Sequence, residues 1–457
     1  MTAPQAAPAV PADPIELLRS RSYLALLVFG AVLGIPVAAV AYAFLKVVAE
    51  IQRYIFATLP ADLFDATPVW WPAPWLMLSG LLVALTIRYL PGTGGHEPSE
   101  GFKSAGALPP IELPGVFLAA LTTLSFGAVL GPEAPLIAIG SGMGVLVVHL
   151  VKKDAPAQAT MVIAAAGSFA AISTLLGSPI IGAFLLMEVI GIGGPLLGVI
   201  LLPGLLAAGI GSLIFVGLNS WTGYGTLSLA IPNIPSFTTP DGVQFLWAVV
   251  IGLAAAVLGA GITRGSRYLQ TIVARNRLLV TPIFGLVVGL SATAFALMTE
   301  RETTDILFSG QDALPSLIAD ASSWSLGALV ALVVCKAIAY SFSLSAFRGG
   351  PIFPAMFIGA AGGMALSHFA GLPMIAGVAM GIGAMTAAML RLPLTSVLLT
   401  TVFLAADGLA LTPLIIVAVV VAYVASAHLT PLAPDVAPPP DEGASPTGTG
   451  PPLAASG

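Results

Sequence analysis

The ten-residue frame Gly-Pro-x-x-Pro-x-x-x-x-Gly occurs twice, as GPEAPLIAIG at residues 131–140 and as GPIFPAMFIG at residues 350–359. With 50 Gly and 38 Pro among 457 residues, random placement predicts only about 0.04 copies, so the repetition indicates an internal duplication. A second pair of segments follows in the same order, with Pro179 in the first copy and Pro393 in the second. The chain is therefore expected to contain two related halves, with a boundary near Asp241.

Both copies lie in apolar surroundings, because 57% of the residues are hydrophobic and only 8% are charged. The mean hydropathy of +1.00 lies outside the range of soluble domains and predicts an all-α integral membrane protein. A membrane-crossing helix needs about 20 residues. The candidate apolar runs include residues 23–45, 75–87, 116–130, 161–176, 195–216, 243–262, 278–298, 326–338, 374–389 and 412–427. Several of these runs are too short or too rich in Gly and Pro for a plain span.

Basic residues predict the orientation in the membrane. Arg19 and Arg21 precede the first apolar run, and the basic segment RGSRYLQTIVARNR covers residues 264–277. The positive-inside rule assigns both to the cytoplasm, although membrane lipid is an alternative partner for the second. The net charge of -5 argues against nucleic acid, and the single Cys335 excludes a disulfide within the chain.

Four segments are expected along the chain. Residues 1–19 and 433–457 are rich in Pro, Ala and Gly and are expected to be disordered tails. Residues 20–240 and 241–432 form the two membrane halves, and no polar stretch is long enough for a soluble domain. The expected location is the cell membrane, which here means a bacterial inner membrane. The four His residues are scattered, so no metal, cofactor or enzymatic activity is predicted.

Each copy of the frame places two backbone amides between its prolines. These amides belong to Glu133 and Ala134 in the first copy and to Ile352 and Phe353 in the second. Proline favours the first turn of a helix, and the first amides of a helix have no intrahelical partner and face the positive end of its dipole. Two such helix starts that converge would bind an anion without a buried cation.

Glu133 lies at one of these helix starts. Between residues 104 and 151 the only other carboxylate is Glu112, and no Lys or Arg occurs. Because a carboxylate is itself an anion, Glu133 is expected to occupy the anion site and to act as its gate, released by protonation. The alternative is a carboxylate that only stabilises its own helix.

These motifs make the chain resemble the CLC family of chloride channels and proton-coupled anion transporters. GPEAP is similar to the family's G-x-E-G-P, with Ala134 in place of the second Gly. GPIFP is similar to the family's G-x-F-x-P, with Ile352 where Phe is usual. Segments at residues 178–189, 307–314, 336–360 and 387–400 follow in family order.

The resemblance covers roughly residues 20 to 430 and implies a homodimer, with a pore in each subunit formed by two inverted halves of tilted, broken helices. It also implies that Glu133 is the gate and that the amides of Ile352 and Phe353 line the anion path. The expected anion-binding residues are Gly131, Ala134, Gly350, Ile352, Phe353, Gly94, Gly95 and His96.

The family's G-S-G-I-P motif is altered. Counted from its proline it becomes GGHEP at residues 94–98, so Gly95 replaces the serine that usually contacts the anion. Alignment on the glycines instead puts Thr93 on that position. The nearby His96, Glu97, Glu100 and Lys103 could form a proton or ion relay, and a solvated loop is the alternative favoured here.

The inner proton-transfer glutamate of family antiporters should follow Glu188, where this chain has Val189. Valine cannot relay a proton. Glu188 could serve as the proton path, or it could have a structural role as a buried partner of Arg391 or Lys336. The structural role is favoured. The family's last helix and its anion-contacting tyrosine are expected to be absent, because Pro-rich sequence follows Leu432.

The main functional hypothesis is thus a passive chloride channel gated by Glu133. A proton-coupled antiporter for chloride or another halide is the alternative, and a non-conducting membrane scaffold of the same fold is the third. Lys336 and Arg348 precede the second motif and could either concentrate anions near the pore or extend to the membrane interface.

Overall fold

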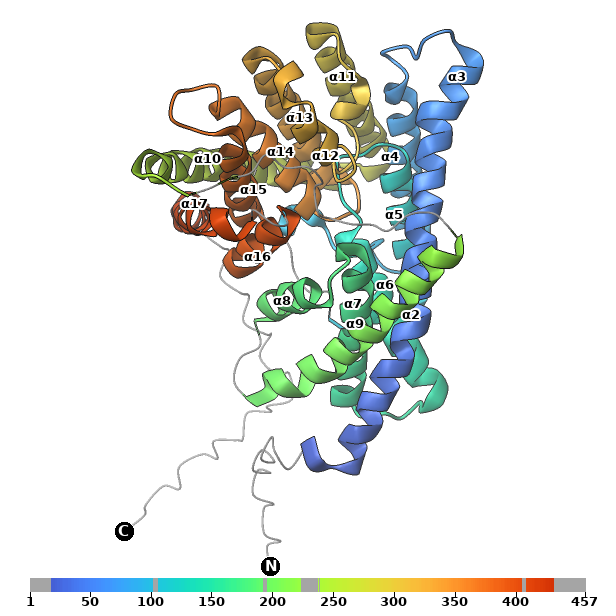
Figure 1. Cartoon of the computed structure of the whole chain (residues 1–457). Coiled ribbons are helices and arrows are strands. Elements are labelled where there is room, and N and C mark those ends of the chain that lie inside the picture. Colours follow the sequence, from blue (N-terminus) through green and yellow to red (C-terminus); the bar gives the residue numbers. More distant parts are fainter. Residues whose placement is uncertain are drawn as a thin grey trace, which may run out of the picture.

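The computed structural model describes residues 18–101, 106–191, 195–222, 237, 239–404 and 408–430. The predicted C-terminal tail, the predicted N-terminal tail except residues 18 and 19, and most of the loop before Asp241 lie outside these residues. Every regular element in the described part is a helix (Figure 1), which confirms the predicted all-α membrane fold.

The first half contains eight α-helices and three short helical turns among the described residues. They are α2 (Arg21–Arg53), η1 (Tyr54–Thr58), α3 (Leu59–Leu63), α4 (Pro72–Tyr89), η2 (Pro98–Glu100), η3 (Pro110–Glu112), α5 (Leu113–Ser125), α6 (Glu133–Val151), α7 (Ala157–Leu176), α8 (Pro179–Ile190) and α9 (Pro195–Thr222).

The second half begins with α10 (Gly242–Arg275). Asp241 caps this helix, since its carboxylate accepts a hydrogen bond from the amide of Gln244 at 2.9 Å. The remaining described elements are α11 (Arg277–Thr299), η4 (Thr303–Asp305), α12 (Leu314–Ala319), η5 (Ala321–Ser323), α13 (Leu326–Ala346), α14 (Ile352–Leu366), α15 (Met374–Leu390), α16 (Pro393–Phe403) and α17 (Gly408–Leu429).

Helix contacts repeat between the two halves. Helix α6 packs on α7 as α14 packs on α15, and α2 packs on α9 as α10 packs on α17. Two further contacts join corresponding helices across the halves, α4 with α11 and α8 with α16. The duplication seen in the sequence therefore extends over most of the described helices.

Glycines at helix crossings explain why the repeated frame ends in Gly. A Cβ on Gly140 would lie 2.3 Å from the carbonyl oxygen of Gly167, and a Cβ on Gly359 would lie 2.2 Å from that of Gly381. Both distances are too short for any side chain, so the α6–α7 and α14–α15 backbones approach closely. Small residues are the usual means of such close packing in membrane helices.

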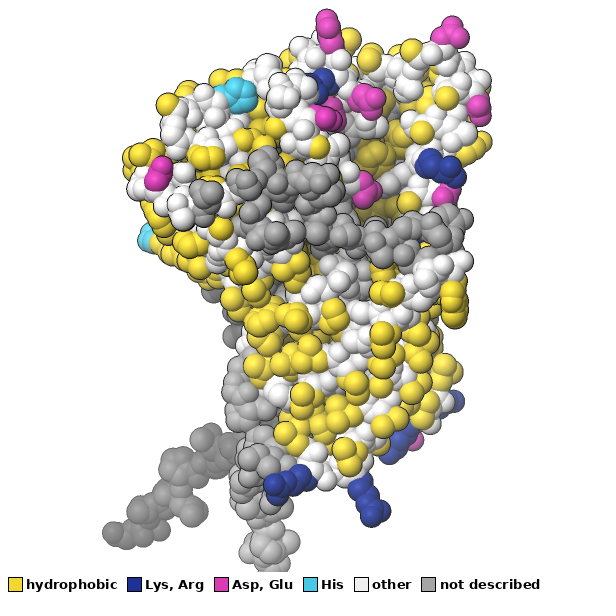
Figure 2. Space-filling model, viewed as in Figure 1, with side chains coloured by type: hydrophobic (Ala, Val, Ile, Leu, Met, Phe, Trp, Pro, Cys, Tyr) yellow, Lys and Arg dark blue, Asp and Glu magenta, His cyan; other side chains and the backbone are white. Residues whose placement is uncertain are grey.

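The described helices suit a multi-pass membrane protein. Eight of them are long and apolar enough to span a membrane, and shorter apolar helices include Ile352–Leu366 and Pro393–Phe403. Figure 2 shows apolar side chains over the middle of one face, with Lys and Arg prominent at the lower end and Asp and Glu gathered at the upper end. The N-terminus of α2 lies at the lower end (Figure 1), and the positive-inside rule predicts that this end faces the cytoplasm.

Candidate functional site

The two copies of the repeated frame meet in the interior. Gly131 and Gly350 form an isolated antiparallel bridge, in which the Gly131 amide donates to the Gly350 carbonyl at 2.7 Å and the reverse bond measures 2.6 Å. Pro132 and Pro351 then cap α6 and α14. The bridge therefore places the N-termini of two helices from different halves next to each other.

Glu133 is the first residue of α6, and its side chain crosses to the other helix. Its Oε1 accepts a hydrogen bond from the amide of Phe353 at 2.9 Å, near the start of α14. The residue is fully buried, and its Oε2 has no hydrogen-bond partner among the described residues. A buried carboxylate thus rests against the positive end of a helix from the opposite half.

Glycine is required beside this carboxylate. A Cβ on Gly350 would lie 1.8 Å from the Glu133 Oε2, and a Cβ on Gly131 would lie 2.2 Å from the same atom. Tyr340 supports the turn, because its hydroxyl donates to the Pro351 carbonyl at 2.8 Å. The first Gly of each frame is therefore needed for the space that Glu133 fills.

The other residues predicted to bind the anion lie on α6, on α14 and in the loop after α4. Ile352 is the buried first residue of α14, and Ala134, the second residue of α6, is partly exposed. Gly94 and Gly95 have φ of 69° and 104°, a conformation that favours glycine. The His96 Nε2 lies 2.8 Å from the Gly101 carbonyl oxygen. This loop is bonded to Arg348 and Gly101 rather than to Glu133.

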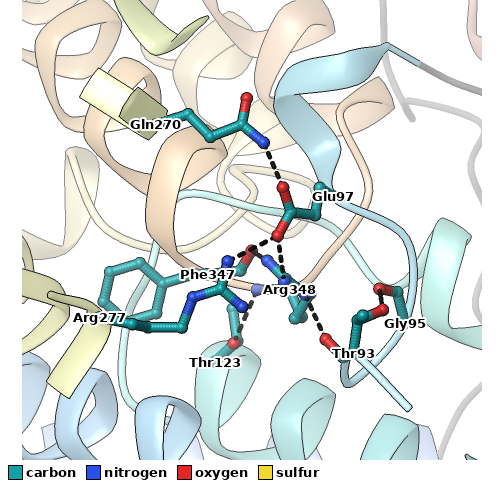
Figure 3. A network of polar contacts seen from close by, with 8 residues as sticks. All are labelled: Thr93, Gly95, Glu97, Thr123, Gln270, Arg277, Phe347 and Arg348. Carbon is teal, nitrogen blue, oxygen red and sulfur yellow. Dashed lines mark hydrogen bonds and ion pairs between the residues drawn. The ribbon is translucent and has the colours of Figure 1, made fainter. Parts of the chain in front are cut away.

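A polar network joins the altered GGHEP segment to the second half (Figure 3). The Glu97 Oε1 lies 2.8 Å from Arg348 Nη2 and 2.7 Å from Arg277 Nη2, and Gln270 donates to its Oε2. Arg348 also donates from Nε to the Thr93 carbonyl at 3.0 Å. The solvated loop favoured from sequence is wrong at Glu97, whose side chain is only 23% exposed and is paired with a buried arginine.

The charge state of Glu97 follows from these neighbours. Burial raises the pKa of its carboxyl, but the charges of Arg348 and Arg277 and the hydrogen bonds from Arg277 and Gln270 outweigh burial. The pKa of Glu97 therefore lies below its ordinary value of 4.5, and the carboxylate is ionised at neutral pH. Two arginines share this single negative charge.

Glu188 is bound to a helix start, not to a cation. Its Oε1 accepts from the Leu394 amide at 2.9 Å and its Oε2 from the Thr395 amide at 2.7 Å, so it caps α16. The two partners predicted from sequence, Arg391 and Lys336, are wrong. Arg391 donates to the carbonyls of Ser426 and Thr430 instead. The N-terminus of α16 attracts the carboxylate because its first amides have no intrahelical partner.

Lys336 is buried within α13, which excludes extension to the membrane interface. Its ammonium donates to the carbonyls of Asp305, Ile306 and Leu307 at 3.1, 3.0 and 3.2 Å, and lies 4.3 Å from the ring centroid of Phe357. Burial raises the pKa of the Asp305 carboxyl to about 6, against the opposing charge of Lys336. Lys336 thus holds the end of η4 in place.

A model of the family described as "Voltage gated chloride channel" matches residues 96–427. This match covers most of the chain. The chain belongs to the voltage gated chloride channel family. Membership confirms the resemblance inferred from the motifs and supports anion transport across a membrane as its general function.

Relatives of this family member include "Putative ion-transport protein YfeO" of Salmonella schwarzengrund and of Salmonella newport. Each is 28% identical over 372 residues, which cover 78% of this chain and 84% of the relative. The fold is similar to that of a slow cyanobacterial Cl-/H+ antiporter, with a TM-score of 0.71 and 19% identity over 89% of this chain and 95% of that chain. A CLC-type fluoride/proton antiporter has a TM-score of 0.67 and 20% identity over 90% and 97%.

Proposed function

We propose that this protein is a passive transmembrane anion channel that conducts chloride and is gated by Glu133. One observation carries the proposal: the buried Glu133 carboxylate, itself an anion, accepts a hydrogen bond from the Phe353 amide. That amide lies at the start of a helix, where anions bind. The side chain therefore occupies a position suited to a transported anion.

The gate works by competition for this position. While Glu133 is ionised it fills the site, and either protonation or an entering anion releases it. The amides of Ile352 and Phe353, together with Gly131, Ala134 and Gly350, then line the anion path. Backbone amides hold an anion less tightly than a buried Lys or Arg, which permits rapid passage.

Gly94, Gly95 and His96 form the inner part of the path in this proposal. The loop contributes positive-φ glycine backbone and is fixed to Arg348 through the carbonyl of Thr93. Arg348 shares the Glu97 carboxylate with Arg277, and the guanidinium groups of this network would attract an anion toward the loop.

Passive conduction is favoured over proton coupling by the contacts of Glu188. Val189 has no titratable group, and both Glu188 oxygens are engaged by amides of α16. A carboxylate held in this way is a poor proton carrier, because protonation would weaken the two hydrogen bonds that hold it.

An antiporter is the second candidate. Two solved structures of similar fold are described as proton antiporters, one for chloride and one for fluoride. Such a mechanism needs an inner proton carrier, and His96 is a titratable group in the partly buried inner loop. A non-conducting scaffold is the third candidate and predicts no flux with any anion.

The protein is proposed to act as a homodimer in a bacterial inner membrane. Large apolar side chains are exposed on α9 and α17, including Leu213 at 68% and Val420 at 50%. Such surfaces suit lipid or a second copy of the chain. The relatives from Salmonella support the bacterial location.

Chloride flux measured together with external pH tests the proposal. Purified protein in proteoliposomes with a chloride gradient is expected to release chloride without moving protons. Glu133→Ala is expected to raise this flux, whereas Glu50→Ala, which removes an exposed carboxylate on α2, is expected to leave it unchanged. Uphill proton movement would show the antiporter instead, and silence with every anion would contradict a pore.

A further inference from the structure

A cavity of about 120 Å³, lined by both apolar and polar residues, lies between η2, α10 and the end of α15. Its polar lining includes Ser99, Glu100, Thr263, Ser266, Arg267 and Arg391. Helix α10 carries the basic segment at residues 264–277 that the positive-inside rule assigns to the cytoplasm. The cavity therefore belongs to the cytoplasmic side of the protein.

Two arginines from different elements line this cavity. Arg267 belongs to α10, and its guanidinium has no hydrogen bond or ion pair with any described residue, while Arg391 follows α15 and uses only Nη2 for its two carbonyl contacts. Burial and the nearby charge of Arg267 lower the pKa of Arg391. Two like charges thus face one cavity, and an anion between them would relieve their repulsion.

The backbone conformation at Arg391 is one that favours glycine, which indicates that the arginine side chain is retained for its contacts. Arg391 has a φ of 59° as the C-terminal cap of α15, and the corresponding cap of α7 is Gly177, also with a φ of 59°. Glycine adopts this left-handed conformation far more readily than any other residue. The second half therefore has an arginine at a position where its repeat has the better-suited glycine.

A hydroxyl without a partner lies on the same cavity. Ser99 is 3% exposed, and its Oγ has no hydrogen-bond partner in the described part of the chain. Ser266 is buried beside it and donates to the Thr263 carbonyl at 3.0 Å, which leaves its oxygen lone pairs free. Buried hydroxyls are nearly always satisfied, so the free Ser99 donor points to a missing acceptor.

We propose that this cavity binds a phosphate-class oxyanion from the cytoplasm. Guanidinium groups match the oxygens of phosphate in paired hydrogen bonds, which a spherical halide cannot accept in the same way. The volume of about 120 Å³ also exceeds the share of a single water in the liquid, about 30 Å³, so it has room for more than one small ion. Arg267, Arg391 and Ser99 supply the donors.

Among the described residues of the lining, Glu100 is the only carboxylate, and it is exposed. Two arginines against this one carboxylate leave an excess of positive charge. Pro351, which caps α14, also lines the cavity. A bound oxyanion would therefore lie near the turn before α14, the helix whose amide binds Glu133. The proposed oxyanion site does not depend on whether the chain conducts chloride.

Binding of inorganic phosphate to the purified full chain in detergent tests the site, with chloride adjusted to hold the ionic strength constant. Isothermal titration calorimetry is expected to show saturable binding to the wild type. Arg267→Gln is expected to weaken it at least tenfold, Ser99→Ala several-fold, and Glu100→Gln to strengthen it. The matched control is Arg264→Gln, because Arg264 lies on the same helix, donates to the Leu429 carbonyl and does not line the cavity.

The source of the phosphate group is resolved by repeating the titration in phosphatidylcholine nanodiscs with and without phosphatidic acid. Competition by phosphatidic acid would identify a lipid headgroup, and its absence a free phosphate compound; both support the site. The proposal is overturned if phosphate does not bind saturably, if Arg267→Gln matches Arg264→Gln, or if bromide displaces phosphate at equal concentration. Thermal melting without phosphate confirms that each variant is folded, and Glu100→Gln tests the site by a gain in affinity.

Discussion

The Gly350→Ala substitution tests the position of the Glu133 side chain without changing the side chain itself. A methyl carbon on residue 350 would lie 1.8 Å from the Glu133 Oε2 and 2.7 Å from its carboxyl carbon. Neither contact is possible, so the carboxylate has to move. That movement breaks its 2.9 Å hydrogen bond with the Phe353 amide.

The size of the effect follows from that bond. A hydrogen bond to a charged group contributes about 1.5–3 kcal/mol, and each 1.4 kcal/mol changes an equilibrium tenfold, so its loss shifts the closed-to-open ratio by about 10- to 150-fold. Gly350 has no positive φ, and the substitution therefore acts through the steric clash and not through backbone conformation.

Chloride efflux from proteoliposomes at neutral pH measures this shift. Gly350→Ala is expected to raise efflux by one to two orders of magnitude. Gly362→Ala is the matched control on α14, because a Cβ there meets no atom within 4 Å, and it is expected to behave as wild type. A folded Gly350→Ala protein with efflux equal to or below that of wild type would refute the gate.

Other substitutions test the contacts around the site. Glu97→Gln is expected to lower the free energy of unfolding by about 1–3 kcal/mol because it leaves a buried arginine charge uncompensated, whereas Glu50→Gln, in an exposed pair, should cost less than about 0.5 kcal/mol. The pKa of Glu97 in the folded protein lies below its ordinary value of 4.5. The contribution of Glu97 to the free energy of unfolding is therefore fully present above pH 4.5 and is lost as the pH falls through the lower folded-state pKa. Melting curves of wild type and Glu97→Gln should consequently converge in acid. Gly363→Val places a Cβ 1.9 Å from a backbone oxygen of α15 and is expected to destabilise by about 3 kcal/mol, while Gly362→Val should be tolerated; equal melting temperatures for the two would contradict the α14–α15 packing. Glu188→Gln is expected to cost about 0.5–2 kcal/mol in thermal unfolding through the weakened cap of α16, and an unchanged melting temperature would argue against that role.

The repeated frame allowed much of the fold to be predicted. Its prolines correctly predicted helix starts at Glu133 and Ile352, and its recurrence predicted two related halves. The roles of its glycines could not be read from spacing. Gly131 and Gly350 form a backbone bridge, and Gly140 and Gly359 allow close helix crossings, and both depend on contacts between distant segments.

Polar partners were the least predictable feature. Glu97 and Arg348 are 251 positions apart, and nothing in the local pattern of either segment indicates their pairing. Glu188 was expected to bind a cation, yet the free amides of α16 bind it instead. Sequence locates charged residues in apolar surroundings, whereas their partners depend on how the two halves pack.

The central claim is that Glu133 occupies an anion-binding position at the start of α14. Bromide scatters anomalously, so crystals of wild type and of Glu133→Ala, each soaked in bromide at neutral pH, test this claim directly. The account predicts an anomalous peak beside the Phe353 amide in Glu133→Ala and none there in the wild type. A variant crystal with no bromide at that amide, or a wild type with bromide bound there beside an unmoved Glu133, would contradict it.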